Sequence, residues 1–180
     1  MKIILLFIIY FFACNTLICQ ELVIGKERIE PGIIFIFEGA IKDVVYPESI
    51  NLSESLTNVH IEARVNWDFD NVPNGTPKGG FVPYLRINAI VKNRRTGVKT
   101  FIDLIPHINM VDNFHYARNL SLPGDIQDIY DVEFRINPPG EYELSFHKDW
   151  VDDFSKTLFN KKSFTYKKVS FFEIAKAKRR

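Results

Sequence analysis

Apolar and polar residues alternate with a period of two along much of the chain, which is the spacing of a half-buried β-strand. The clearest case is NVHIEARVNW (58–67), where apolar side chains take every second position. His60, Glu62 and Arg64 share the opposite face of this predicted strand. The segment DVEFRI (131–136) alternates in the same way.

Other short runs are rich in β-branched and aromatic residues and are bounded by glycine or proline, which is typical of strands. These predicted strands are 33–37, 40–46, 81–93, 98–108, 141–147 and 163–172. We expect the apolar residues of EYELSFH (141–147), Tyr142 among them, to be buried. The sequence RRTG (94–97) predicts a hairpin connection in which Gly97 has a positive φ.

No segment shows a sustained apolar period of 3.6 residues, no internal repeat is visible, and no linker is long enough to separate domains. About eight short strands with regular turn signals remain. This pattern predicts an all-β fold, an immunoglobulin-like antiparallel β-sandwich.

The N-terminus has the layout of a secretory signal peptide, with Lys2 followed by an apolar run that is too short to span a membrane. We predict a signal peptide over 1–19, cleaved after Cys19, and a single domain over 20–180 that ends in a basic tail. The alternative is a lipoprotein acylated at Cys14. Both interpretations place the protein in the periplasm.

Composition narrows the chemistry that this protein can carry out. The 23 basic and 22 acidic residues nearly balance, and loss of Lys2 with the signal peptide takes the net charge from +1 to zero. This balance gives no electrostatic case for binding nucleic acid. Both cysteines lie in the signal segment, so the exported protein has neither a disulfide nor a thiolate. Metal ligands would have to be imidazole, carboxylate, amide or thioether groups.

The four histidines are the best candidates for chemistry. His60 and Glu62 lie about 6.6 Å apart along one strand face, as two ligands of a preorganised site would. On its own, this pair is more typical of a solvated strand face than of a metal site. His107 and His115 fall in LIPHINMVDNFHYARNL (104–120), which is typical of a surface loop or of one side of a metal site. The motifs of zinc proteases, serine hydrolases and phosphate-binding loops are absent.

Four segments in order resemble one known family. They are NVHIEARV, GFVPYLRI with the turn that ends at Gly97, the IPH…D…HYARN stretch, and INPPG. Together they are similar to the periplasmic high-affinity iron-transport family, over about residues 30–172. The resemblance implies a small immunoglobulin-like protein that binds copper and iron ions, forms a homodimer and partners a ferrous-iron permease of the inner membrane.

The resemblance also implies a ligand set. The family motif H-x-E falls on His60 and Glu62, and D-x-x-H-Y falls on Asp112–Tyr116, which implies His115 as a ligand with Asp112 close by. A later family histidine falls on His147. A second, weaker site nearby would be formed by His147, Asp112 or Met110. Arg64 and Tyr116 would orient the ligands from behind.

One position departs from the family pattern. The family commonly has Pro-Met where this chain has Pro106-His107, and that methionine is a copper ligand. Either His107 replaces the thioether, or Met110 supplies it after a local shift; we favour His107 because it follows the proline directly. Imidazole in place of thioether would lower the preference for Cu(I).

Three functions are compared at this point. The first is a periplasmic metal-binding protein of iron uptake, which is not an enzyme and takes no small organic substrate. The second is an exported structural or adhesion domain without metal, since the fold alone does not determine function. The third is a mononuclear non-haem metalloenzyme using His60, Glu62 and His115, for which no substrate motif is visible.

Overall fold

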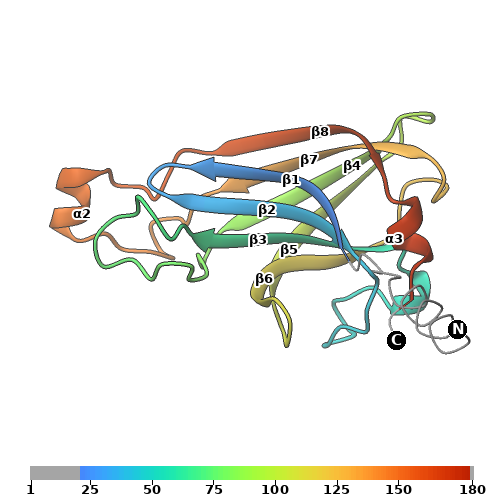
Figure 1. Ribbon diagram of the computed structural model, residues 1–180, viewed down its shortest axis with the longest axis horizontal. Helices are drawn as coiled ribbons and strands as arrows, with labels where there is room; N and C mark the ends of the chain where they lie inside the picture. Colours follow the sequence, from blue (N-terminus) through green and yellow to red (C-terminus); the bar gives the residue numbers. More distant parts are fainter. Residues whose placement is uncertain (1–20, 179–180) are drawn as a thin grey trace, which may run out of the picture.

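The computed structural model describes residues 21–178. Its eight strands form one antiparallel sheet in the order β1-β2-β3-β6-β5-β4-β7-β8 (Figure 1). The strands are β1 (Glu21–Ile29), β2 (Ile33–Ala40), β3 (Val59–Trp67), β4 (Arg86–Asn93), β5 (Lys99–Asn109), β6 (Asn113–Leu120), β7 (Ile129–Asn137) and β8 (Lys162–Ser170). Three short helices complete the elements: η1 (Glu54–Leu56), α2 (Lys148–Asp153) and α3 (Phe172–Lys176). The predicted all-β antiparallel fold is confirmed. The immunoglobulin-like description is broadly consistent with this arrangement of eight strands.

The sheet curls until its first and last strands come together, so that it is nearly closed. The hydroxyl of Tyr166 on β8 donates to Glu27 Oε1 on β1 at 2.9 Å. Inside lies an apolar core in which Phe37 stacks on Phe134 with 4.1 Å between ring centroids. Alternation on β3 and β7 puts their apolar faces into this core, as the sequence predicts. The core therefore occupies one face of the curled sheet and leaves the other face for chemistry.

Several local predictions are wrong. Residues 41–46 do not continue a strand, because Ala40 pairs with His60 and β3 extends only one residue further. Residues 141–147 form a turn in which Tyr142 is fully exposed, since β4 and β8 already occupy both sides of β7. The sequence pattern predicts no strand over 21–29 or over 113–120, where β1 and β6 lie.

Both chain ends bear on earlier predictions. The signal peptide (1–19) lies outside the described residues, and the assignment of 20–180 to one domain stays a prediction. In the basic C-terminal segment, Ala175 and Lys176 belong to α3. Within residues 21–178, no helix combines the length and the apolar character needed to cross a membrane.

The β4–β5 hairpin offers a test of local geometry. Gly97 has a φ of 77°, as its place in the RRTG turn predicts, and the space around its α-carbon is open. Gly97→Ala should therefore destabilise the protein by about 1 kcal/mol through backbone strain alone. Gly97→Asn should cost less, because asparagine tolerates this region better than alanine does. Urea denaturation of the three proteins measures both effects, and equal stability of all three would contradict the strain argument.

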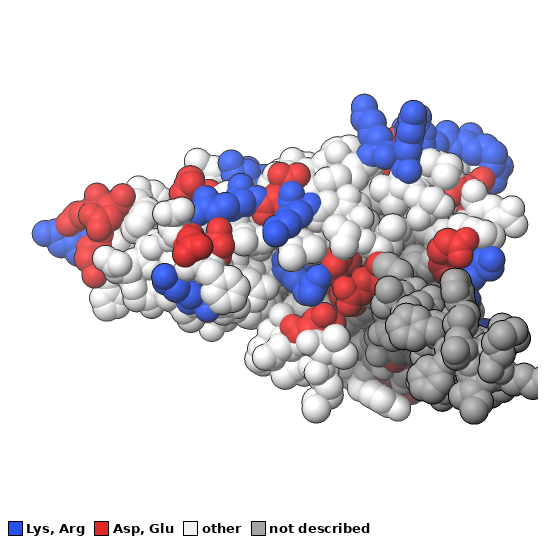
Figure 2. All heavy atoms as spheres, in the orientation of Figure 1, with Lys and Arg blue, Asp and Glu red and all other residues white. Residues whose placement is uncertain are grey.

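Acidic and basic side chains are interspersed on the visible surface (Figure 2). Lysine and arginine side chains protrude at the upper right, around the β4–β5 hairpin, and acidic side chains gather above the β5–β6 hairpin. The hairpin below the acidic side chains carries His107 and His115, which belong to the candidate site.

Candidate metal centre

Three neighbouring strands bring three of the histidines together. His60 lies on β3, His115 on β6 and His107 on β5, and β6 is paired with both of the other strands. His107 and His115 are direct cross-strand partners. All three extend from the face opposite the core, where the segment after β2 covers the sheet and lines a cavity of about 530 Å³ with them. The stretch 104–120 is therefore a β-hairpin and not a surface loop.

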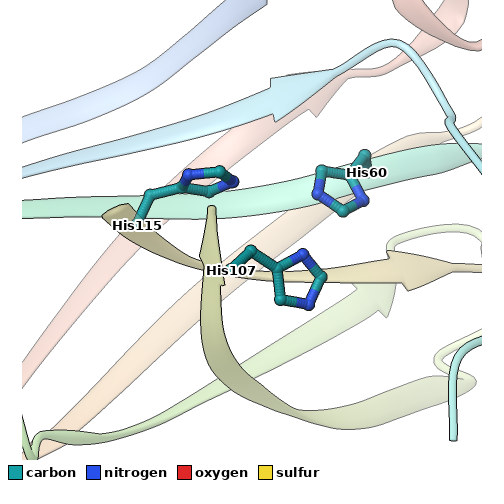
Figure 3. Close-up of side chains that lie close together, drawn as sticks. All are labelled: His60, His107 and His115. Carbon is teal, nitrogen blue, oxygen red and sulfur yellow. The ribbon is translucent and has the colours of Figure 1, made fainter. Parts of the chain in front are cut away.

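The three imidazoles are close enough to share one ion. A ligand nitrogen from each lies within 4.8 Å of the others. Their ring centroids are 5.3 Å apart for His60 and His107, 5.9 Å for His107 and His115, and 6.4 Å for His60 and His115. Figure 3 shows the rings facing a common space between the strands. Sequence spacing alone could not show this, because 47 positions separate His60 from His107.

Hydrogen bonds and burial determine where the protons lie on these imidazole rings. Nδ1 of His115 lies 3.0 Å from the carbonyl oxygen of Asn113, which can only accept, so this nitrogen carries the proton and Nε2 keeps its lone pair. Burial and, to a smaller extent, the neighbouring His60 and His115 lower the pKa of His107 to about 4. His107 is thus neutral at physiological pH, and its buried Nε2 makes no hydrogen bond within the described structure.

Glu62 extends the histidine cluster with a carboxylate. It follows His60 by two positions on β3, is 2% exposed, and places Oε1 at 3.7 Å from His60 Nε2. Its other oxygen has no hydrogen-bond partner among the described residues. Burial, together with the nearby carboxylates of Asp112, Glu21 and Glu38, raises the pKa of Glu62 to about 8 against the opposing effect of Arg64. A buried carboxyl with one unpaired oxygen, beside three imidazoles, is an arrangement that a cation would stabilise.

A single arginine balances the carboxylates behind Glu62. Arg64 contacts Glu38 through two nitrogens, each 2.7 Å from a carboxylate oxygen. Asp112 lies 3.5 Å from the same guanidinium and Glu21 lies 3.8 Å from it. The guanidinium of Arg64, which is predicted from the sequence to orient a ligand, lies among these carboxylates; Glu21 and Glu38 were not anticipated. The sequence offered one signal for these carboxylates: Glu38 is the only charged residue in the run IIFIFEGA. In the structure, Glu38 is the cross-strand partner of Glu62.

The remaining predicted residues lie elsewhere. Met110 is fully exposed at the tip of the β5–β6 hairpin, and only His107 of the two alternatives joins the cluster. His147 precedes α2 at the opposite end of the molecule and shares a cavity with Trp67. Tyr116 faces the core, where its hydroxyl donates to the Val82 carbonyl, so it does not orient a ligand.

The donor set defines the chemistry open to this centre. Three imidazoles and one carboxylate suit first-row ions such as Cu(II), Fe(II) and Zn(II), and the absence of sulfur among them disfavours Cu(I). The orphaned nitrogen of His107 and oxygen of Glu62 are the buried polar atoms that such an ion would satisfy. The residues therefore fit a metal ion.

Known structures share this fold. The copper-reconstituted P19 protein of Campylobacter jejuni is 28% identical and matches with a TM-score of 0.68 over 82% of this chain and 94% of its own. A copper-bound variant of P19 is 27% identical and matches at 0.69 over 83% and 97%. FetP of uropathogenic Escherichia coli strain F11, recombinantly expressed in the periplasm, matches at 0.67 over 84% and 97%; at 22% identity it supports the fold alone.

Comparison with curated protein sequences gave no significant match. The sequence does match the family described as Fe2+ transport protein over residues 18–172, nearly the whole chain. This agrees with the four ordered segments and with the fold of the copper-binding relatives. The chain belongs to the Fe2+ transport protein family.

Proposed function

We propose that this protein binds copper and iron in the periplasm and supplies iron to an inner-membrane permease during high-affinity uptake. The observation that carries the proposal is the cluster of His60, His107 and His115 beside the buried carboxyl of Glu62. These four residues are the proposed ligands. The family is one of transport proteins and not of enzymes, which supports a binding role without catalysis.

Copper is supported by the donor set and by the relatives. P19 of Campylobacter jejuni is described in copper-reconstituted form, and its identity to this chain is 28%. A site of imidazole and carboxylate groups favours Cu(II), which exceeds every other divalent first-row ion in affinity at such a site. With His107 in place of a thioether, this chain should hold Cu(I) less tightly than a relative that has methionine there.

Iron is supported by the family and by the carboxylates that adjoin the histidines. Oxygen ligands suit iron better than they suit Cu(I), and Glu62 lines a second cavity together with Asp112 and Glu21. Because Fe(II) binds more weakly than Cu(II) at a shared site, iron loading depends on its supply or on a redox step. Weaker binding also permits release to a permease.

The proposed partners are a second copy of the chain and the permease. Ile108, Met110 and Val111 expose apolar side chains on the hairpin that carries His107 and His115. An exposed apolar group of this kind supports a protein–protein contact next to the centre. The predicted signal peptide is the basis for placing the protein in the periplasm. The alternative is an exported lipoprotein that is anchored through an acylated Cys14.

Calorimetric titration of the exported, metal-free protein tests the proposal. We expect one tight Cu(II) site per chain and weaker Fe(II) binding under anaerobic conditions. The double substitution His60→Ala and His115→Ala should abolish the tight site, because only one imidazole of the cluster remains. His147→Ala is the matched control, since His147 lies outside the cluster, and it should bind copper as wild type does.

Two outcomes would contradict the proposal. Copper and iron binding equal in wild type and the double variant would place the site elsewhere. Normal growth of a deletion strain under iron chelation would remove the role in uptake, even with metal binding intact.

A further inference from the structure

Asn119 makes three hydrogen bonds that connect the metal centre to the segment covering it. It lies on β6 directly opposite His60 in the strand register and is 2% exposed. Its Oδ1 is 2.7 Å from His60 Nδ1. Its Nδ2 donates to the carbonyl oxygens of Asp43 and Leu52, both at 2.8 Å. One buried amide therefore contacts a histidine of the cluster and both ends of the segment 43–52.

These partners determine which way the amide points. Carbonyl oxygens only accept hydrogen bonds, so the two contacts from Asp43 and Leu52 require the NH₂ group of Asn119 on their side. The amide oxygen must then face His60, and since this oxygen only accepts, His60 Nδ1 must carry a proton. In a neutral imidazole the other nitrogen, Nε2, then has the lone pair.

We propose that Asn119 is the positioning residue of the metal centre. It holds His60 in the Nδ1–H tautomer, with Nε2 as the metal-binding nitrogen, and fastens the segment 43–52 over the histidines. The tautomer is a property of the metal-free protein. The effect on metal affinity rests on the proposed function.

The other two histidines are positioned differently. His115 Nδ1 donates a hydrogen bond to the backbone carbonyl of Asn113. No side-chain substitution removes that carbonyl. No protein hydrogen bond to His107 Nε2 is found within the described residues. Asn119 is thus a side chain whose replacement changes the orientation of one ligand and leaves the backbone support of His115 in place.

The first test reads the tautomer directly in metal-free protein. Two-bond proton–nitrogen correlation spectra of ¹⁵N-histidine-labelled protein should show His60 in the Nδ1–H form in wild type. Asn119→Ala should shift His60 toward the Nε2–H form, which prevails in unconstrained imidazole. Asn119→Asp keeps an acceptor for His60 and loses both donors, so it should preserve the tautomer while faster amide hydrogen exchange appears over 43–52.

The second test reads copper affinity. Asn119→Ala should weaken Cu(II) binding about 10–100-fold, the usual effect of removing the group that orients a histidine ligand. Asn93→Ala is the matched control: Asn93 is also a buried hub, bonded to Asp128 and to backbone amides of the β4–β5 hairpin, and lies outside the site. It should lose stability and keep the copper affinity of wild type.

An Nε2–H tautomer of His60 in wild type, or an unchanged tautomer in Asn119→Ala, would overturn the proposal. So would equal loss of copper affinity in Asn119→Ala and Asn93→Ala, because the effect would then be general destabilisation. If wild type shows the Nδ1–H tautomer and binds neither copper nor iron, the proposed function fails while the assignment to Asn119 stands.

Discussion

Glu62→Gln is expected to stabilise the metal-free protein at alkaline pH while weakening its hold on metal. The pKa of Glu62 is raised from 4.5 to about 8, so the folded state keeps a proton that the unfolded chain loses. The contribution of Glu62 to stability is therefore fully present below pH 4.5, falls as pH rises, and is lost through pH 8. The amide of the variant has no charge to bury, so Glu62→Gln should gain up to about 5 kcal/mol at pH 9 and almost nothing at pH 4.

Urea denaturation with a chelator present, at pH 4, 7 and 9, measures this difference. The exposed Glu54→Gln is the control and should change stability by less than about 0.5 kcal/mol at each pH. Because Glu62 must lose its proton to bind a cation, copper affinity of wild type should increase by up to tenfold per unit between pH 6 and pH 8. Parallel pH profiles of stability for wild type and Glu62→Gln would show that this carboxyl is ionised in the metal-free protein.

Arg64→Met should destabilise the protein by about 2–4 kcal/mol at pH 8. Glu38 is completely buried, and Arg64 supplies its two close cationic contacts. Without the guanidinium, Glu38 must either remain a buried charge or take up a proton. The loss should shrink at pH 5, where protonation removes the uncompensated charge. The pKa of Glu62 should also rise further, since Arg64 lowers it in the native protein.

A second substitution distinguishes charge from packing. If the uncompensated carboxylate is the cause, adding Glu38→Gln to Arg64→Met should restore most of the lost stability. Arg135→Met removes an exposed pair with Glu133 and should cost less than about 1 kcal/mol. Failure of Glu38→Gln to rescue would point to the lost aliphatic contacts of Arg64 instead.

The strands with clean alternation were predictable because one face of each packs on the core. This holds for β3 and β7, whose apolar residues are mostly buried. It fails for 41–46 and 141–147, whose composition is strand-like but for which the sheet offers no open edge. The composition of a segment shows whether its side chains suit a sheet. It does not show whether a neighbouring strand is free to pair with that segment.

The site was predictable only as far as the family resemblance and local spacing reached. His60 and Glu62 could be placed on one face of a strand, and taken alone that face looked better suited to solvent than to a metal ion. Its burial depends on the segment after β2, which no periodicity in the sequence marks. Glu38 and Asn119 were missed for a related reason: their contacts connect strands that are distant in sequence.

The fully exposed side chain of Met110 has a consequence for durability. Met110 is the only methionine in the described part of the chain, and it lies at a hairpin tip outside the histidine cluster. Copper and iron generate peroxide and radicals in air, and these convert methionine to its sulfoxide. With His107 as the proposed ligand in place of sulfur, such oxidation would alter a surface side chain and leave the proposed donor atoms unchanged.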